Sequence, residues 1–424
     1  MKKVLLAGAS TYGVKNMGDD AMLYNLTQTL HERIDCEIVF LARHPQGGYD
    51  EEYGIRSIKN FEHDSREQSL GRYFYGFNRG DGRNHLDAIR EEMAGCDIVV
   101  IGGNSFMEVS ASSFLRGVVS YSSLVATLAI FMNKPYVLYG VHGHPPKLEI
   151  TAQMARFLCS NAALVTCREQ FYKGVLADLG ATGEHIQVFG DPAYGIDPVQ
   201  DPELGRAILR EQGIAFGRKN VVGVSFRHMY WVWDEPEFAR LAEKMAQFCD
   251  RLVEVLDADL LVIPNCTYNI DNINEDDRYV AKVFMDKMRH RADIHLVDRD
   301  MSLTETLSLY RGIDMIVSNR RHACIFGAVY DKPVHALSTG HPWQFKPFVE
   351  DLGLTGCYSS FTEDGVEELA RAVRTTWENR ERHAASLAQT MPRLRERAKS
   401  QVDAIIAIMN AKKGEEKVPP AAHP

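Results

Sequence analysis

Short apolar runs alternate along the chain with segments whose apolar residues recur every three or four positions. In the first half, the apolar runs predict strands at residues 4–8, 37–42, 97–102, 136–141, 163–166 and 185–189. Segments with helical spacing predict helices at residues 20–34, 147–161 and 169–179. Residues 47–90 interrupt this alternation because they are polar and rich in glycine and aromatic residues. We expect this segment to be a long functional or mobile loop with some helix.

The alternation returns after a segment near residue 200 that is interrupted by prolines. Strands are predicted at residues 221–226, 260–263, 294–297, 315–317 and 334–337, and helices at 236–256, 275–291, 303–310 and 323–330. Strands separated by helices of this length form parallel sheets. The fold class is therefore predicted to be α/β, with two Rossmann-like doubly wound domains at 1–200 and 201–345. We expect residues 346–412 to be helices that pack back on the N-terminal domain, and 413–424 to be a disordered tail.

Composition narrows the functional classes. The 424-residue chain carries a formal net charge of −9, which argues against nucleic acid as a partner. Its eight cysteines are scattered, without a CxxC pair, and they indicate reduced thiols in a reducing compartment and no metal site. The apolar run near the N-terminus is too short for a signal core, and no stretch is long enough to cross a bilayer. We therefore expect a cytoplasmic location.

Polar residues follow several of the predicted strands, where ligands of open parallel sheets usually bind. The first such stretch is Asn16-Met17-Gly18-Asp19-Asp20. An anion or a sugar hydroxyl could bind at this helix start, or Asp19 could simply cap the helix and Asp20 oppose its dipole. A second stretch, Gly102-Gly103-Asn104, either lets a ligand approach the backbone or forms a tight turn.

Basic residues follow three other strands. Arg168 could pair with Glu169 or Asp191, or its planar guanidinium could bind a carboxylate or phosphate. His142 is interpreted as a loop histidine in the cleft. The most informative stretch is Asn319-Arg320-Arg321-His322, because two cations at a helix N-terminus oppose the helix dipole. A bound anion would offset that cost, which favours a functional role for Arg320 and His322, although one of the arginines could instead be a surface residue or form an ion pair between domains.

The ordered set of these stretches resembles the polysaccharide pyruvyltransferase family. Asn16-x-Gly18-Asp19-x-Ala21 resembles its N-x-G-D-x-A motif, and Gly102-Gly103-Asn104 its glycine-rich loop. Arg168-Glu169 resembles its R-[DE] position, and Arg320-x-His322-Ala323 resembles its R-L-H-A motif. Two residues depart from the family pattern: Asn104 replaces a glycine and Arg321 replaces a leucine.

The resemblance implies a GT-B-like arrangement, with the acceptor on the N-terminal domain and the donor on the C-terminal domain. It implies an enzyme that moves a pyruvyl group from phosphoenolpyruvate to two hydroxyls of a sugar and forms a ketal. By this resemblance Arg168 and Arg320 hold the donor and His322 is the general acid. Asp19 is expected to act as a base or to orient its loop. The substrate-binding residues are then predicted to be Arg168, Arg320, Arg321, Asn16, Gly18, Gly103, Asn104, His142 and Asn319.

The expected partners are phosphoenolpyruvate and a glycan or lipid-linked sugar acceptor of the cell envelope, and no cofactor or metal is expected. A lipid-linked acceptor would bring the chain to a membrane surface as a peripheral protein, and a homo-oligomer is also compatible with the sequence. Two alternatives stay open at this point. One is a GT-B glycosyltransferase that uses a nucleotide sugar, and the other is a glycan-binding relative without turnover.

Overall fold

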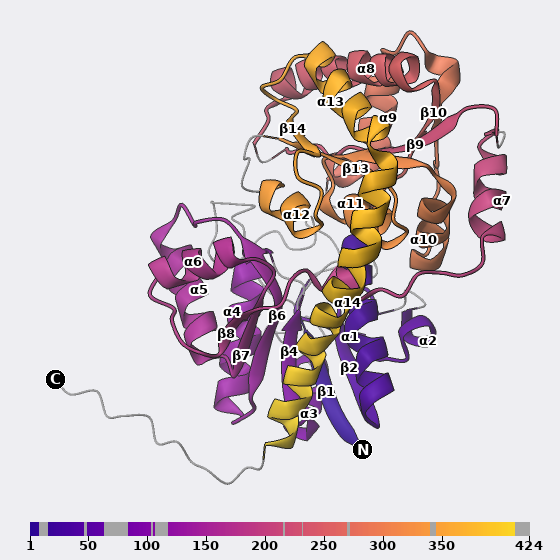
Figure 1. Cartoon of the computed structure of the whole chain (residues 1–424). Coiled ribbons are helices and arrows are strands. Elements are labelled where there is room, and N and C mark those ends of the chain that lie inside the picture. The colour runs from indigo at the N-terminus through magenta and orange to yellow at the C-terminus, as the bar shows by residue number, and fades with distance from the viewer. Residues whose placement is uncertain are drawn as a thin grey trace.

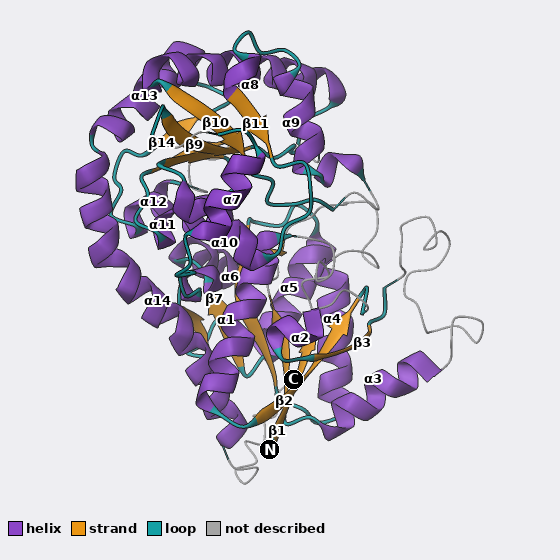
Figure 2. Ribbon diagram, turned by 90° about the vertical axis from the view of Figure 1, so that its right-hand side faces the viewer, coloured by secondary structure: helices purple, strands orange, loops and turns teal. Residues whose placement is uncertain are grey.

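A computed structural model gives the arrangement of the chain. It describes residues 1–7, 16–45, 49–62, 84–102, 105–106, 118–214, 217–230, 232–268, 272–339 and 345–411. Within these residues the helices and strands form two α/β units, one above the other in Figure 1. Each unit is a parallel sheet with helices on its faces, as Figure 2 shows from the side. The predicted α/β fold class with two Rossmann-like units is therefore confirmed.

The N-terminal sheet has the strand order β3-β2-β1-β4-β6-β7-β8, and β5 pairs with β6. Its central strands are almost wholly apolar and buried on both faces, as parallel strands covered by helices must be. The strands are β1 (Lys2–Ala7), β2 (Cys36–Ala42), β3 (Arg56–Lys59), β4 (Ile98–Gly102), β5 (Ser105–Phe106), β6 (Tyr136–Gly143), β7 (Leu164–Cys167) and β8 (Ile186–Val188). The helices are α1 (Met17–Arg33), α2 (Tyr49–Tyr53), α3 (Asn84–Gly95), α4 (Val118–Phe131), α5 (Glu149–Asn161), α6 (Gln170–Asp178) and the short 3-10 helix η1 (Pro192–Gly195).

The C-terminal sheet has the order β11-β10-β9-β12-β13-β14. Its strands are β9 (Asn220–Ser225), β10 (Ala258–Val262), β11 (Ile294–Leu296), β12 (Met315–Ser318), β13 (Val334–Ser338) and β14 (Tyr358–Ser360). The helices are α7 (Glu203–Glu211), α8 (Glu235–Leu256), η2 (Ile273–Glu275), α9 (Asp277–Met285), η3 (Arg291–Asp293), α10 (Leu303–Gly312), α11 (Arg321–Val329) and α12 (Lys346–Asp351). None of the helices in the described ranges is both long enough and apolar enough to cross a membrane.

Two helices follow the second sheet, α13 (Val366–Glu378) and α14 (Arg380–Asn410). Helix α14 runs along both domains, as Figures 1 and 2 show. Leu387 and Leu394 of α14 pack in a core cluster shared with the C-terminal domain. Farther along the helix, Val402 and Ile405 pack in the cluster that holds β1 and α1 of the N-terminal domain. One continuous helix therefore contributes to the cores of both domains.

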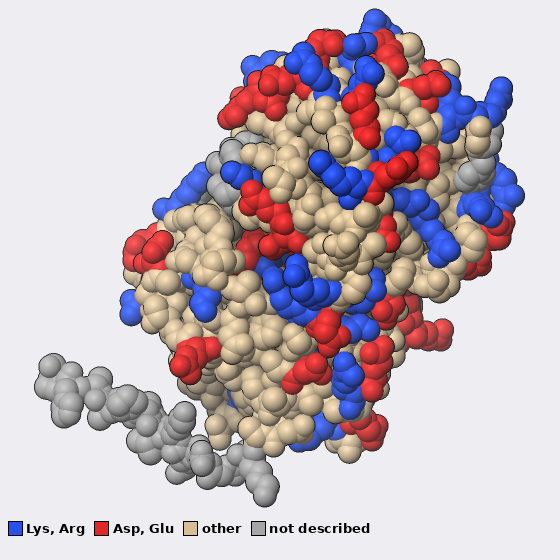
Figure 3. All heavy atoms as spheres, viewed as in Figure 1, with Lys and Arg blue, Asp and Glu red and all other residues tan. Residues whose placement is uncertain are grey.

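Basic side chains of α14 hold the segment that connects the two sheets. Figure 3 shows lysine and arginine side chains gathered where the two domains meet, over α14. Arg397 Nε donates to the carbonyl oxygen of Phe189 at 2.8 Å, and Arg395 Nε donates to that of Ile196 at 3.1 Å. The connecting segment is thereby fixed against the helix that spans both domains.

Two expectations about elements were wrong in part. Residues 47–90 contain helix, as expected, in α2 and the start of α3, but they also contain the strand β3, which was not expected, and residues 63–83 lie outside the described residues. The helix expected at 275–291 ends at Met285. Asp250 of α8 explains that early end, since its carboxylate accepts hydrogen bonds from the backbone N–H groups of Arg289 and His290 at 3.1 and 2.8 Å. The predicted tail at 413–424 also lies outside the described residues.

Candidate active site

The two domains meet at the start of α1. Asn16 forms an isolated antiparallel bridge with Cys266 of the C-terminal domain, and the backbone N–H of Met17 donates to the carbonyl oxygen of Asn265 at 2.9 Å. The side chain of Asn16 accepts a hydrogen bond from Gly18 N and is the N-cap of α1. Asn16, predicted to bind substrate, thus shapes the backbone here. Asp19 follows, half-buried, in the first turn of the helix.

Gly18 and His322 touch across this domain boundary. His322 comes from the first turn of α11. A Cβ atom added at Gly18 would overlap the imidazole ring of His322, so a larger residue at position 18 would have to displace the ring. The sequence therefore requires glycine here for close approach between domains, and not for an unusual backbone angle.

Asp191 is the buried centre of an ion cluster. It follows β8, is 0% exposed, and caps η1 by accepting a hydrogen bond from Ala193 N. Arg168 Nη1 donates to its carboxylate at 3.0 Å, Arg321 Nε lies 3.6 Å away and His322 Nε2 lies 3.7 Å away. Burial alone would raise the pKa of Asp191, but Arg168 and His322 outweigh burial and hold that pKa well below its ordinary value. Asp191 is therefore charged near neutral pH.

Arg168 is engaged at all three of its guanidinium nitrogens. Besides the bond to Asp191, its Nε donates to the carbonyl oxygen of Gly140 at 2.9 Å and its Nη2 lies 2.9 Å from the sulfur of Met22. Direct binding of a donor by Arg168 would require one of these contacts to be exchanged. In this conformation its clearest effect is to hold Asp191 in place beside His322.

His142 and Glu169 form a second part of the same cluster. His142 Nδ1 lies 3.0 Å from Glu169 Oε2. Burial, together with the nearby cations Arg321 and Arg168, holds the pKa of His142 well below its ordinary value. The ring is therefore neutral near neutral pH, and its Nδ1–H donates to the carboxylate. The other oxygen of Glu169 forms an ion pair with Arg321.

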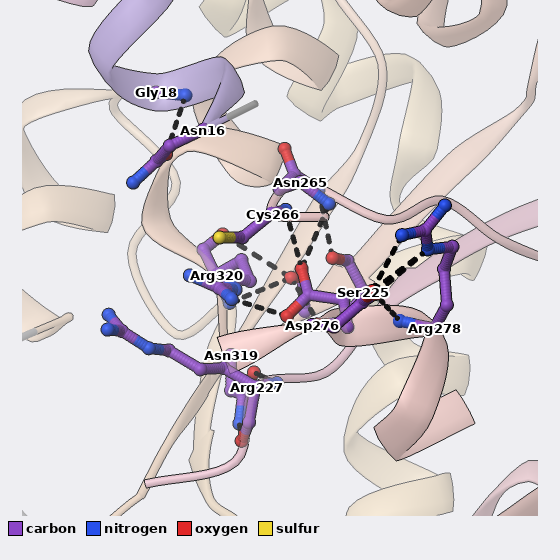
Figure 4. A network of polar contacts seen from close by, with 12 residues as sticks. Asn16, Gly18, Ser225, Arg227, Asn265, Cys266, Asp276, Arg278, Asn319 and Arg320 are labelled. Atoms are coloured by element: carbon purple, nitrogen blue, oxygen red, sulfur yellow. Dashed lines mark hydrogen bonds and ion pairs between the residues drawn. The ribbon is translucent and has the colours of Figure 1, made fainter. Parts of the chain in front are cut away.

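A separate ion pair lies in the C-terminal domain, beside the contact between domains (Figure 4). Arg320 pairs with Asp277, whose other oxygen accepts hydrogen bonds from the backbone N–H groups of Asn265 and Cys266 at 2.9 and 3.0 Å. Burial tends to lower the pKa of Arg320, yet Asp277 raises it above its ordinary value. Arg320 is thus firmly cationic, and its partner fixes the loop that contacts α1.

Asn319 forms two hydrogen bonds with the backbone of Arg227, which follows the adjacent strand β9. Its Oδ1 accepts a hydrogen bond from Arg227 N at 2.7 Å, and its Nδ2 donates to the carbonyl oxygen of Arg227 at 3.3 Å. Burial, followed by the repulsion of Arg320, lowers the pKa of Arg227 to about 10, which leaves its side chain charged near neutral pH. Asn319, predicted to bind substrate, therefore positions Arg227 through the backbone.

The structure brings most of the predicted site residues to one place. Gly18, Arg168, Arg321, His322 and His142 meet around Asp191 and Glu169, and Asn319 and Arg320 directly precede Arg321 after β12. Gly103 and Asn104 lie outside the described residues. From the sequence, Glu169 and Asp191 were considered only as ion-pair partners of Arg168, and the structure shows the pair with Asp191. Arg227 and Asp277 were not predicted as members of the site. Asp191 had a usable signal, because it follows a predicted strand, whereas Asp277 is an acidic residue at the start of a helix, and only the fold shows its pairing with Arg320.

Comparison with known proteins shows which family the chain belongs to. The model of the polysaccharide pyruvyl transferase family matches residues 16–341, from the N-cap of α1 to beyond the Arg320–Ala323 stretch. The chain belongs to the polysaccharide pyruvyl transferase family. The resemblance seen in the sequence is thereby confirmed. A comparison with curated proteins gives no match.

Solved structures support the fold of this family member. HepE from Anabaena in complex with UDP-glucose matches with a TM-score of 0.61 and 13% identity, over 96% of this chain and 99% of that one. A putative UDP-N-acetylglucosamine 2-epimerase from Listeria monocytogenes matches with a TM-score of 0.60 and 15% identity, over 96% and 95% of the two chains. These likenesses concern the fold alone, and they confirm the GT-B-like arrangement predicted for the chain.

Proposed function

We propose that the chain transfers a pyruvyl group from phosphoenolpyruvate to two hydroxyls of a sugar in a cell-surface polysaccharide or its precursor, forming a ketal. The observation that carries this proposal is the position of His322. Its ring lies where the two domains touch, against Gly18 and beside the charged Asp191, with arginines on neighbouring strand ends. Family membership supports the reaction class, and the site offers an acid–base group at the contact between the domains, next to arginine side chains.

The donor is a compact multiple anion, and arginine is the side chain best suited to bind one. Arg320 is the strongest candidate, because its buried Nε has no hydrogen-bond partner among the described residues. Buried donors are normally paired, so a ligand oxygen at this nitrogen would complete the site. Arg227, held by Asn319 on the adjacent strand end, is a second cation that could bind the donor's phosphate or carboxylate.

The chemistry can be divided between these residues. His322 in its protonated form gives a proton to the methylene carbon of the donor, which becomes a methyl group, and C2 becomes oxocarbenium-like. A sugar hydroxyl attacks C2 and loses its proton, with Asp19 proposed as the base. Phosphate then leaves C2 with the electrons of its C–O bond and takes up the proton held by Asp19, which restores the base. The second hydroxyl closes the ketal, and its proton restores the protonated histidine. Nothing in this scheme calls for a cofactor.

The acceptor is proposed to bind on the N-terminal side of the contact between domains, near the start of α1. A glycan or a lipid-linked sugar both present the required pair of hydroxyls. A cytoplasmic location is part of the proposal, since all eight cysteines are free thiols buried in the protein.

The proposal is tested by incubating the protein with phosphoenolpyruvate and a panel of glycans and measuring released phosphate. We expect release that depends on an acceptor, and a loss of at least about 100-fold in His322→Gln, the range expected for a general acid. His295→Gln, at the far edge of the second sheet, serves as the control and should retain activity. Absence of both phosphate release and donor binding by calorimetry would refute the proposal. Thermal stabilisation by UDP alone would instead favour nucleotide-sugar chemistry.

A further inference from the structure

We propose that Arg321 is a positioning residue, an ion-pair strut between the two domains that sets where His322 meets the N-terminal domain, and that it is not a ligand of the donor. This inference rests on the proposed function only for its activity measurements. It replaces the substrate-binding role expected from the sequence. The argument depends on the partners of the guanidinium, on the charge of the buried cluster and on the neighbouring histidine.

The guanidinium of Arg321 reaches from one domain into the other. Arg321 is the first residue of α11 in the C-terminal domain. Its Nη1 pairs with Glu169, which caps α6 of the N-terminal domain, and its Nε lies 3.6 Å from Asp191 Oδ2. Both nitrogens therefore face carboxylates that are fixed to the N-terminal sheet, at the ends of β7 and β8.

The remaining face of the guanidinium is also covered. The ring of Phe348 in α12 lies 5.0 Å from the guanidinium carbon, within the range of a cation–π contact. The side chain of Arg321 is only 11% exposed. Carboxylates at its edge and an aromatic ring over its face surround the guanidinium. Burial, followed by the repulsion of Arg168, lowers the pKa of Arg321 to about 9, which leaves the side chain charged near neutral pH.

The charges within the cluster indicate that Arg321 neutralises Glu169. Asp191 is already paired with Arg168. Glu169 is buried and contacts His142, but that ring is neutral near neutral pH and cannot compensate a charge. Arg321 is therefore the counter-ion of Glu169. A leucine at this position, as in the family motif that the chain resembles, could pack there but would leave Glu169 without a cation.

Arg321 affects catalysis by positioning the next residue, His322. Because Arg321 begins α11, its pairing with the N-terminal domain fixes the first turn of that helix. His322 follows directly, with its ring against Gly18 and its Nε2 3.7 Å from Asp191. A shift of the helix start would move the ring away from both, and misplacement by about 1 Å can cost about 100-fold in rate.

The experiment is a double-mutant cycle with Arg321→Leu, Glu169→Gln and the double variant. Arg321→Leu should lower kcat by about 10–100-fold and change KM for phosphoenolpyruvate by less than about 3-fold. It should also lower Tm, because a buried carboxylate loses its cation. The double variant should regain part of both losses, since a neutral amide at position 169 needs no counter-ion. Arg206→Leu, which breaks an exposed ion pair with Glu203 in α7, is the matched control and should change neither quantity.

The opposite pattern would overturn the proposal. A donor ligand at this position would show a large rise in KM for phosphoenolpyruvate in Arg321→Leu and no recovery in the double variant. If Arg321→Leu does not fold, Glu169→Gln alone tests the proposal, and an unchanged kcat in that variant would also contradict it. The Tm cycle needs no substrate, so it tests the strut even if the chain turns out not to use phosphoenolpyruvate.

Discussion

At the scale of single residues, the contact between Gly18 and His322 explains why a glycine stands at position 18. The glycine belongs to the loop motif of one domain and the histidine to the helix motif of the other, more than 300 positions apart in the chain. They touch because α1 and α11 begin at the same point of the contact between domains, and only a residue without a side chain leaves room for the ring.

Gly18→Ala should therefore separate activity from stability. The new methyl group must push the imidazole away, and we expect phosphate release to fall by about 10–100-fold. Gly174→Ala is the matched control, because it lies inside helix α6 with open space around its Cβ position. That variant should keep its activity and gain about 0.5–1 kcal/mol in free energy of unfolding. Equal activity in the two variants would contradict the contact described here.

Asp191 should make stability depend on pH. Its pKa in the folded protein is held below the ordinary value of 3.8, so its contribution is fully present above that pH. The contribution is lost as pH falls from 3.8 towards the lowered pKa. At neutral pH we expect Asp191→Asn to lower the free energy of unfolding by about 3–5 kcal/mol, because Arg168 loses its partner.

Urea unfolding of both proteins between pH 7 and the lowest pH at which they fold will check this. The difference between them should shrink by roughly 1.4 kcal/mol for each pH unit below the ordinary aspartate pKa. A difference that stays constant in acid would show that Asp191 does not carry its charge in the folded state.

At the scale of elements, hydrophobic periodicity predicts what is buried and little else. The apolar runs that predict the central strands of both sheets coincide with strands in the structure. Strand β3 was missed because it lies at the edge of its sheet, is partly exposed, and has no apolar run. The early end of α9 was missed because its cause, the carboxylate of Asp250, lies on another helix.

The same limit applies to the candidate site. Residues in short motifs, such as Gly18 and His322, could be predicted because each motif follows a strand and the order of motifs resembles a family. Their partners could not be predicted in this way. Asp277, at the start of α9, pairs with Arg320 after β12, although β9 lies between β10 and β12 in the sheet, so only the folded sheet shows that the two residues meet.

At the scale of the whole molecule, the two domains should unfold as one. A single apolar cluster contains Met22 of α1, Tyr194 of η1, Phe326 of α11 and Leu394 of α14. Ion pairs around Arg321 and the backbone contacts of Asn16 and Met17 add to this joint core. We expect calorimetry to show one transition, with its calorimetric enthalpy close to the van't Hoff enthalpy. Two resolved transitions would indicate that the domains are stabilised independently.

The position of α14 at the end of the described chain also affects the order in which the domains can complete their folding during synthesis. Val402 and Ile405 cover the N-terminal sheet, yet the ribosome makes them after every strand of both sheets. The first domain to emerge must wait, with part of its apolar surface uncovered, for the last helix of the described chain. Until then the nascent chain has an exposed surface that invites aggregation and is a natural target for chaperones.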